Sequence, residues 1–297
     1  MLDRLSRSWH MIQQCWRVLL ADKSLLLFPI LAAVTSVLAF ALMVGPILLE
    51  IPGEVAGAQP TSATGETTSW APSAVQVALF FGAAFVATFL SIFFNVAMVC
   101  CARRSFRGED TTVGEGIGAA MSRLPQILGW ALVSFLVGVL LNALDAIADE
   151  APPPISIIAN VGVWLIGLAW SAATFLVISV LAYENVGPIA AVRRSTDAVK
   201  KTWGESLAGN MAMGLIFFFA GVLPAIGLCV FGGSQFEANP ALGTLLVGIG
   251  VAYGCIAMTL SSAINNLFRA AVYEYAATGS VPAGFSQREL AGAFTTK

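Results

Sequence analysis

Residues 188–203 read PIAAVRRSTDAVKKTW, and their spacing decides how the rest of the chain is interpreted. On a helix, spacings of three and four place one set of largely apolar side chains on a single face. These are Ile189, Val192, Thr196, Val199 and Trp203. The basic side chains fall on the other faces, and these are Arg193, Arg194, Lys200 and Lys201. The pattern is typical of an amphipathic helix that lies flat in the headgroup region of a membrane, with its cations toward anionic lipid.

The same pattern occurs twice more along the chain. The N-terminal copy has Leu5, Trp9, Ile12, Trp16 and Leu19 on one face, with Arg4, Arg7 and Arg17 off it. A weaker copy comprises Val113, Ile117, Met121 and Leu124. Each copy precedes two long apolar runs, so we predict three units of one surface helix and one membrane hairpin. The units are residues 1–102, 108–182 and 188–277, followed by a cytoplasmic tail, residues 278–297.

Composition indicates a polytopic membrane protein. The 297 residues are 58% hydrophobic and only 11% charged, whereas soluble domains carry roughly 25% charged residues. Six apolar runs reach the roughly 20 residues that cross a bilayer. They are residues 24–49, 72–102, 126–147, 155–182, 206–232 and 241–276. We therefore predict an all-α fold, one membrane domain with six transmembrane helices arranged as three hairpins.

The distribution of charge predicts the orientation in the membrane. With the N-terminus inside the cell, all 15 Lys and Arg residues fall on the cytoplasmic side, and the outer loops carry only acids. Cytoplasmic loops are enriched in Lys and Arg. We therefore expect both termini in the cytoplasm and eight cations at anionic inner-leaflet headgroups. These are Arg4, Arg7, Arg103, Arg104, Arg193, Arg194, Lys200 and Lys201.

Two asparagines predict a polar contact inside the third and fourth runs. Asn142 and Asn160 lie at equal distances from the turn that contains Ala151. An amide facing lipid costs several kcal/mol, whereas an interhelical bond contributes about 0.6–2 kcal/mol. We expect both amides to point into the bundle, where they could bond each other. They would serve either as a structural clamp or as part of a ligand site.

The last two runs carry small residues and a proline. Pro224 predicts a kink or early unwinding, which is either ordinary for a membrane helix or part of a gate. Gly250 and Gly254 allow close helix packing, within the chain or in a homo-oligomer.

Asparagines also stand near the inner ends of the second and sixth runs, at Asn95, Asn265 and Asn266. The interval from Asn266 to Gly279 equals that from Asn95 to Gly108, which indicates an internal repeat.

Catalytic, cofactor and metal motifs are missing from the sequence. The single histidine, His10, lies on the polar side of the first surface helix, without a cluster of Cys or carboxylate residues that would bind a metal. The centres of the six runs carry no Asp, Glu, Lys, Arg or His, which disfavours an ion-coupled transporter. The apolar faces of the basic helices favour the membrane over nucleic acid. These helices would either anchor the protein or recognise lipid or a protein partner.

Two stretches resemble known families. Residues 5–29, LSRSWHMIQQCWRVLLADKSLLLFP, are similar to the opening of an uncharacterised bacterial membrane-protein family, domain of unknown function 6159. Residues 187–203, GPIAAVRRSTDAVKKTW, resemble a wider group of six-span proteins that includes the membrane portion of some glycerophosphodiester phosphodiesterases. The resemblance implies a six-helix protein of a bacterial inner membrane. It implies no enzymatic activity, because the soluble phosphodiesterase barrel is missing.

Three functions remain open at this point. The first is a non-enzymatic membrane scaffold that binds lipid or a protein partner, without a cofactor. The second is a passive channel or transporter for a small neutral or hydrophobic solute, lined by Asn142, Asn160 and the Pro224 kink. The third is an accessory membrane subunit of a lipid-modifying enzyme.

Overall fold

A computed structural model describes residues 2–50, 73–201 and 214–285, with side chains for residues 10–45, 73–200 and 214–285. Within these residues all regular structure is helical. The elements are α1 Leu2–Ala21, α2 Ser24–Glu50, α3 Ala74–Ser105, α4 Val113–Met121, α5 Leu124–Glu150, α6 Ile155–Ala173, α7 Val177–Tyr183, α8 Pro188–Lys201, the π-helical turn η2 Phe218–Val222, α10 Leu223–Ser234 and α11 Pro240–Thr278. The predicted all-α fold is confirmed for the described part of the chain.

Six helical stretches are long and apolar enough to cross a membrane, as predicted. They are Ser24–Gly45, Ala74–Ser105, Leu124–Glu150, Ile155–Tyr183, Gly214–Ser234 and Pro240–Thr278. Two of them are irregular: the fourth is interrupted between α6 and α7, and the fifth contains η2. The three stretches predicted as surface helices are also helical, as α1, α4 and α8.

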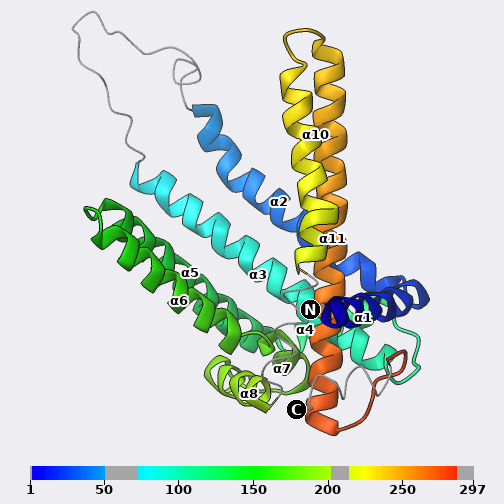
Figure 1. Ribbon diagram of the computed structural model, residues 1–297. Helices are drawn as coiled ribbons and strands as arrows, with labels where there is room; N and C mark the ends of the chain where they lie inside the picture. The colour runs from blue at the N-terminus through cyan, green and yellow to red at the C-terminus, as the bar shows by residue number, and fades with distance from the viewer. Residues whose placement is uncertain (1, 51–72, 202–213, 286–297) are drawn as a thin grey trace, which may run out of the picture.

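The spans pack as α2 against α3, α5 against α6 and α10 against α11. Figure 1 shows the three pairs meeting at the end of the molecule where α1, α4 and α8 lie. Toward the opposite end α10 and α11 diverge from the other two pairs, which stay in contact through α3 and α5. We call the first of these the basal end and the second the distal end. At the basal end α11 also contacts α2, α3 and α7, so this is where the three pairs are joined.

The hydrophobic core lies at the basal end. Its largest fully buried side chains include Phe28, Met98, Ile127, Leu176 and Phe268. Toward the distal end large apolar side chains are exposed, such as Leu42 (76%), Ile158 (71%) and Val230 (68%). Contiguous apolar surface of this extent is typical of a membrane-facing protein.

Local sequence explains where two of the long helices begin. Ser73 and Gln76 form a capping box at the start of α3, with Gln76 N donating to Ser73 Oγ (3.2 Å) and Ser73 N donating to Gln76 Oε1 (2.9 Å). At the start of α11, Leu242 N donates to the Asn239 side chain (3.2 Å), and Pro240 occupies the first turn, where it leaves no hydrogen bond unmade.

Left-handed glycines follow the basal ends of α3 and α11. Gly279 has a φ of 70° and stops α11 directly, and Gly108 has a φ of 78° in the turn after α3. Glycine reaches this conformation without the steric cost that a Cβ would bring. Gly108 and Gly279, which follow Asn95 and Asn266 at the same interval, therefore share a backbone conformation.

The interruption of the fourth span is held by α8. The N–H of Leu176 has no partner in its own helix and donates to Ser195 Oγ across 3.0 Å in the buried interior. Ser195 lies on a face of α8 with Ala191 and Val199, and all three are buried against the bundle. Ile189, by contrast, is 72% exposed.

The predicted apolar face of α8 is therefore only partly right. Ala191 and Ser195, which are small and four residues apart, let α8 approach α6 and α7 closely. The face of α8 that is buried against the protein therefore lies next to the predicted apolar face. Trp203 lies outside the described residues.

Candidate functional site

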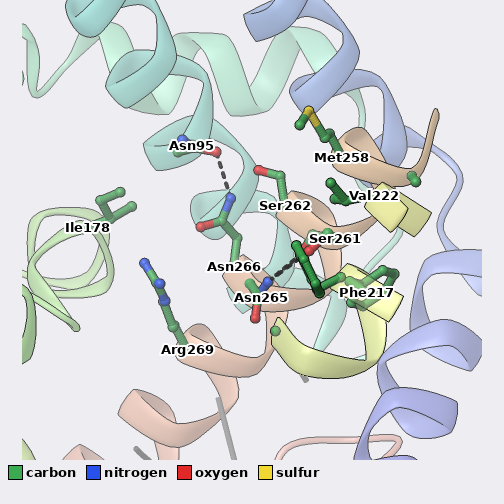
Figure 2. A pocket seen from close by; sticks show the side chains of 13 residues that line it. Asn95, Ile178, Phe217, Val222, Met258, Ser261, Ser262, Asn265, Asn266 and Arg269 are labelled. Carbon is green, nitrogen blue, oxygen red and sulfur yellow. Dashed lines mark hydrogen bonds between the residues drawn. The ribbon is translucent and has the colours of Figure 1, made fainter. Parts of the chain in front are cut away.

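A pocket of about 470 Å³ lies at the basal end of the spans, bordered by α3, α7, the fifth span and α11 (Figure 2). Its volume falls within the roughly 300–1,000 Å³ of small-molecule sites. The polar side chains come mainly from α11, and these are Ser261, Ser262, Asn265, Asn266 and Arg269. A ligand group of molecular size, rather than a single ion, fits this space.

Two asparagine amides form the middle of the pocket. Asn266 Nδ2 donates to Asn95 Oδ1 across 2.6 Å, which joins α11 to α3 (Figure 2). Asn265 Nδ2 donates to the main-chain oxygen of Ser261 across 2.8 Å and lies 3.2 Å from its hydroxyl. Because a carbonyl oxygen can only accept, this contact fixes the Asn265 amide with its oxygen on the other side. That oxygen, Oδ1, is buried and has no hydrogen-bond partner in the described structure.

Arg269 supplies the positive charge of the pocket. Its guanidinium carbon lies 4.7 Å from the centroid of the Phe175 ring, a cation–π contact that orients the side chain. Its Nε is buried without an acceptor, and among the described residues no carboxylate lies within ion-pair distance. The guanidinium is thus positioned by the ring and retains unused hydrogen-bond donors.

The remaining wall of the pocket is apolar. Phe217, Phe218 and Val222 of the fifth span face Met258 of α11, and Met258 is 62% exposed on the outer surface of the helix. The pocket therefore combines a polar, cationic part with an apolar part that reaches the membrane-facing surface.

The length of α11 locates the pocket relative to the bilayer. At 1.5 Å per residue, Ser261 lies about 32 Å and Arg269 about 44 Å from the first residue, Pro240. The hydrocarbon core of a bilayer is about 30 Å thick. A bilayer is about 40–45 Å thick with its headgroups included. If α11 starts at the outer edge of the distal headgroups, the serines lie just inside the basal hydrocarbon boundary and Arg269 lies among the basal headgroups.

The polar pocket residues of α11 form a stripe along the helix that was not predicted from the sequence. Ser261, Asn265 and Arg269 recur every four residues, which places them on one face of an otherwise apolar helix. The asparagines were singled out in the sequence, but Arg269 and the serines were missed as members of a site. A search for polar residues at helical spacing would have found them.

Two of the cations predicted at lipid headgroups are exposed without a protein partner in the described structure, and three make protein contacts. Arg193 and Lys200 are the exposed ones. Arg194 pairs with Glu184, and Arg104 pairs with Glu109 at 2.8 Å and Glu115 at 3.1 Å. The Arg103 guanidinium lies 4.6 Å from the centroid of the Tyr183 ring. The side chains of Arg4, Arg7 and Lys201 lie outside the described residues.

Arg103 and Arg194 belong to a second polar cluster, between α3, α7, α8 and α11. The Tyr273 hydroxyl donates to Glu184 across 2.5 Å, and the Tyr273 and Tyr183 rings lie edge to face at 5.2 Å. Because Glu184 also pairs with Arg194, this cluster ties α8 to α11. The sequence did not predict it, since its members are far apart along the chain.

The predicted bond between Asn142 and Asn160 is wrong. Asn142 Nδ2 donates to the main-chain oxygen of Gly138 in its own helix, at 2.8 Å, and Asn160 Nδ2 donates to Asp149 at 2.9 Å. Partners nearer in sequence satisfy both amides. Asn142 is exposed and lines a separate groove of about 600 Å³ between α3 and α5, with Phe81 and Phe135.

The glycines of the sixth span pack against α10 of the same chain. A Cβ built on Gly250 would lie 2.8 Å from Cys229 Sγ and 3.1 Å from Ala225 O, and one on Gly254 would lie 3.2 Å from Ala225 Cβ. Pro224 follows η2, so the predicted irregularity takes the form of a π-helical turn. It lies on a different helix pair from Asn142 and Asn160, and neither described pocket is lined by all three.

The chain matches one known protein family. A model described as a family of unknown function, DUF6159, matches residues 74–285, which is more than half of the sequence. The chain belongs to this family. No curated protein and no solved structure matches it.

The DUF6159 match spans α3 to α11 and so includes every described element of the basal pocket. Within the described residues no group of three or more His, Cys, Asp or Glu side chains forms a potential metal site. The polar stripe of α11 is therefore the candidate binding site of this DUF6159 member.

Proposed function

We propose that this DUF6159 protein is a non-enzymatic integral membrane protein that binds lipid, with the basal pocket as the binding site. The observation that carries the proposal is the combination, in one pocket, of an apolar wall at the membrane-facing surface with amides, hydroxyls and a guanidinium at headgroup depth. A phospholipid likewise has apolar acyl chains next to a polar headgroup with a charged phosphate. A fully polar metabolite would leave the wall formed by Phe217, Phe218 and Val222 without an apolar partner.

The charge distribution supports a placement of the pocket in the inner leaflet. With α1, α4 and α8 on the cytoplasmic side, all 15 Lys and Arg residues of the sequence lie inside. The exposed cations Arg193 and Lys200 would then attract anionic lipid to the basal end, each contributing about 1 kcal/mol near the surface. On this proposal the surface helices enrich lipid around the pocket, and the three helix pairs are membrane hairpins.

A lipid census of the purified protein tests the proposal. The full chain is extracted into mild detergent, and native mass spectrometry counts the lipids that it retains. Ser262→Phe places a ring in the pocket and is expected to lower the retained lipid, because Ser262 lines the cavity. Ile256→Phe is the matched control, since Ile256 is 67% exposed on the same helix and does not line the pocket.

Two results would refute lipid binding at this site. The first is a wild-type protein that retains no lipid under conditions that preserve its fold. The second is an equal loss of lipid in the two phenylalanine variants, which would assign the retained lipid to the general surface. Counting protein chains in the same spectra tests for a homo-oligomer, and a co-purified soluble hydrolase would instead favour an accessory subunit.

A further inference from the structure

We infer that the basal pocket selects a phospholipid with an anionic phosphate and a hydroxyl-bearing headgroup, of the phosphatidylglycerol type. The inference rests on the proposed function and names the chemistry that the pocket recognises. Three features of the polar part determine it: an oriented guanidinium, an amide oxygen that lacks a donor, and the absence of carboxylates from the described lining.

The guanidinium requires an anionic acceptor. Arg269 is held against Phe175, so its planar donors are fixed in direction. Its Nε is covered by protein and has no acceptor in the described structure, so the terminal nitrogens are the donors that a pocket ligand would meet. Guanidinium groups bind phosphate through paired N–H donors, which fixes geometry as well as charge. The position of Arg269 near headgroup depth matches that of a lipid phosphate rather than that of an acyl chain.

The amide oxygen requires a donor. Asn265 Nδ2 is committed to the Ser261 carbonyl, so Asn265 Oδ1 can be satisfied only by a group that donates. Protein atoms cover this oxygen, so a ligand reaches it when a neighbouring side chain shifts. A buried acceptor without a donor is costly, and a ligand that supplies one gains affinity from it. The phosphate cannot fill this role because it only accepts. A headgroup hydroxyl can, and Ser262, whose hydroxyl can donate or accept, lines the same space.

The positive charge of the pocket favours a headgroup with a hydroxyl over one with an ammonium group. An ethanolamine ammonium would also donate to Asn265, but it would bring a second positive charge into a pocket that already contains Arg269. None of the described lining residues is a carboxylate that could offset it. Phosphatidylglycerol carries one negative charge, which the guanidinium neutralises, so it fits better than phosphatidylethanolamine. Phosphatidylcholine lacks a hydrogen-bond donor altogether.

A headgroup series on the full-length wild-type protein tests the inference without any substitution. Delipidated protein is titrated with lipids of identical acyl chains, and site occupancy is measured by native mass spectrometry. The series is phosphatidylglycerol, phosphatidylmethanol, phosphatidylethanolamine and phosphatidylcholine. Phosphatidylmethanol has the charge of phosphatidylglycerol but no hydroxyl, so it isolates the contribution of the donor. We expect phosphatidylglycerol to bind most tightly and phosphatidylmethanol to bind severalfold more weakly.

Two substitutions assign the selectivity to the pocket. Arg269→Gln is expected to weaken phosphatidylglycerol binding by roughly tenfold to a hundredfold, the usual effect of losing a hydrogen bond to a charged group. Arg107→Gln is the control, because it removes one exposed cation in the turn after α3, outside the pocket and outside the surface helices. Asn265→Leu should reduce the preference for phosphatidylglycerol over phosphatidylmethanol toward unity while leaving phosphatidylmethanol affinity largely unchanged. Excess inorganic phosphate and glycerol 3-phosphate should not displace the lipid.

The outcomes separate this inference from the proposed function. Equal occupancy by all four lipids, together with full sensitivity to Ser262→Phe, would overturn the headgroup selectivity and leave lipid binding intact. Equal binding of phosphatidylglycerol and phosphatidylmethanol would overturn the role of the Asn265 oxygen. Displacement by free phosphate would assign the site to a soluble anion instead. Binding of none of the lipids would overturn both proposals.

Discussion

Adding one methyl group at Gly250 should destabilise the contact between α10 and α11. A Cβ at this position would meet Cys229 Sγ at 2.8 Å, and it would lie 3.1 Å from both Ala225 O and Cys229 N. Two of these three atoms belong to the backbone of α10, so they cannot move aside by a side-chain rotation. Gly250→Ala therefore requires the two helices to separate.

The size of the effect follows from two opposing contributions. Replacing a glycine inside a helix by alanine favours the helix by about 0.5–1 kcal/mol. Forcing a methyl group into a packed contact costs about 1–3 kcal/mol. Gly248→Ala is a matched control, because a Cβ there meets nothing within 4 Å on the same helix. The two variants share the propensity term, so their difference in unfolding free energy, about 1–3 kcal/mol, measures the steric term alone.

Reversible unfolding by dodecyl sulfate in mixed micelles measures this difference. A difference of about 1–3 kcal/mol corresponds to roughly a fivefold to 150-fold change in the unfolding equilibrium. Adding Cys229→Ala to Gly250→Ala should restore part of the loss, since it removes the Sγ contact and leaves the two backbone contacts. Equal stability of Gly250→Ala and Gly248→Ala would refute the close approach of these helices.

Three further outcomes are expected. Replacing Asn95 and Asn266 by leucine, singly and together, should give a coupling energy of about 0.6–1.7 kcal/mol in a double-mutant cycle, because the two amides bond each other. Ser195→Ala should destabilise the protein by about 1–3 kcal/mol and speed hydrogen exchange at the Leu176 amide, which loses its buried acceptor. Burial raises the pKa of Cys15, so at pH 8 its alkylation in the folded protein should be slower than that of an ordinary thiol.

Each of these has a control. For the serine, Thr196→Val removes a hydroxyl that bonds only its own helix, at Val192 O, and should leave Leu176 exchange unchanged. For the thiol, a protein retaining Cys15 alone should be alkylated much more slowly when folded than when unfolded at the same pH, because burial disfavours the thiolate. Equal rates in the folded and unfolded protein would contradict the burial. Additive asparagine variants would contradict the bond between their amides.

The number of spans could be predicted from sequence because crossing a bilayer imposes a minimum apolar length on each helix. The six runs met this length, and their observed bounds differ mostly at the ends. The interruption between α6 and α7 could not be predicted in the same way. It depends on Ser195, which reaches Leu176 only after α8 has packed beneath the span. A tertiary contact, rather than a local signal, therefore sets this boundary.

The site was predictable only in part, for a related reason. Asn95 and Asn266 share an interval to their glycines, and this regularity of sequence corresponds to a real contact in the structure. Asn142 and Asn160 looked equally symmetric, yet each found a partner closer along the chain. Symmetric depth permits a bond between two amides but does not exclude nearer acceptors. Arg269 was overlooked because a single cation near a helix end is an ordinary feature.

The divergence of the helix pairs has a consequence for the surrounding bilayer. On the basal side the molecule is a solid obstacle, because a packed core fills the space between the pairs. On the distal side the pair of α10 and α11 stands apart, whereas the other two pairs stay in contact through α3 and α5. Large apolar side chains such as Leu42 and Val230 are exposed there. Lipids of that monolayer would lie between α10–α11 and the other two pairs. A change in membrane thickness would then tilt α10 and α11 relative to the rest of the molecule while the base keeps its form.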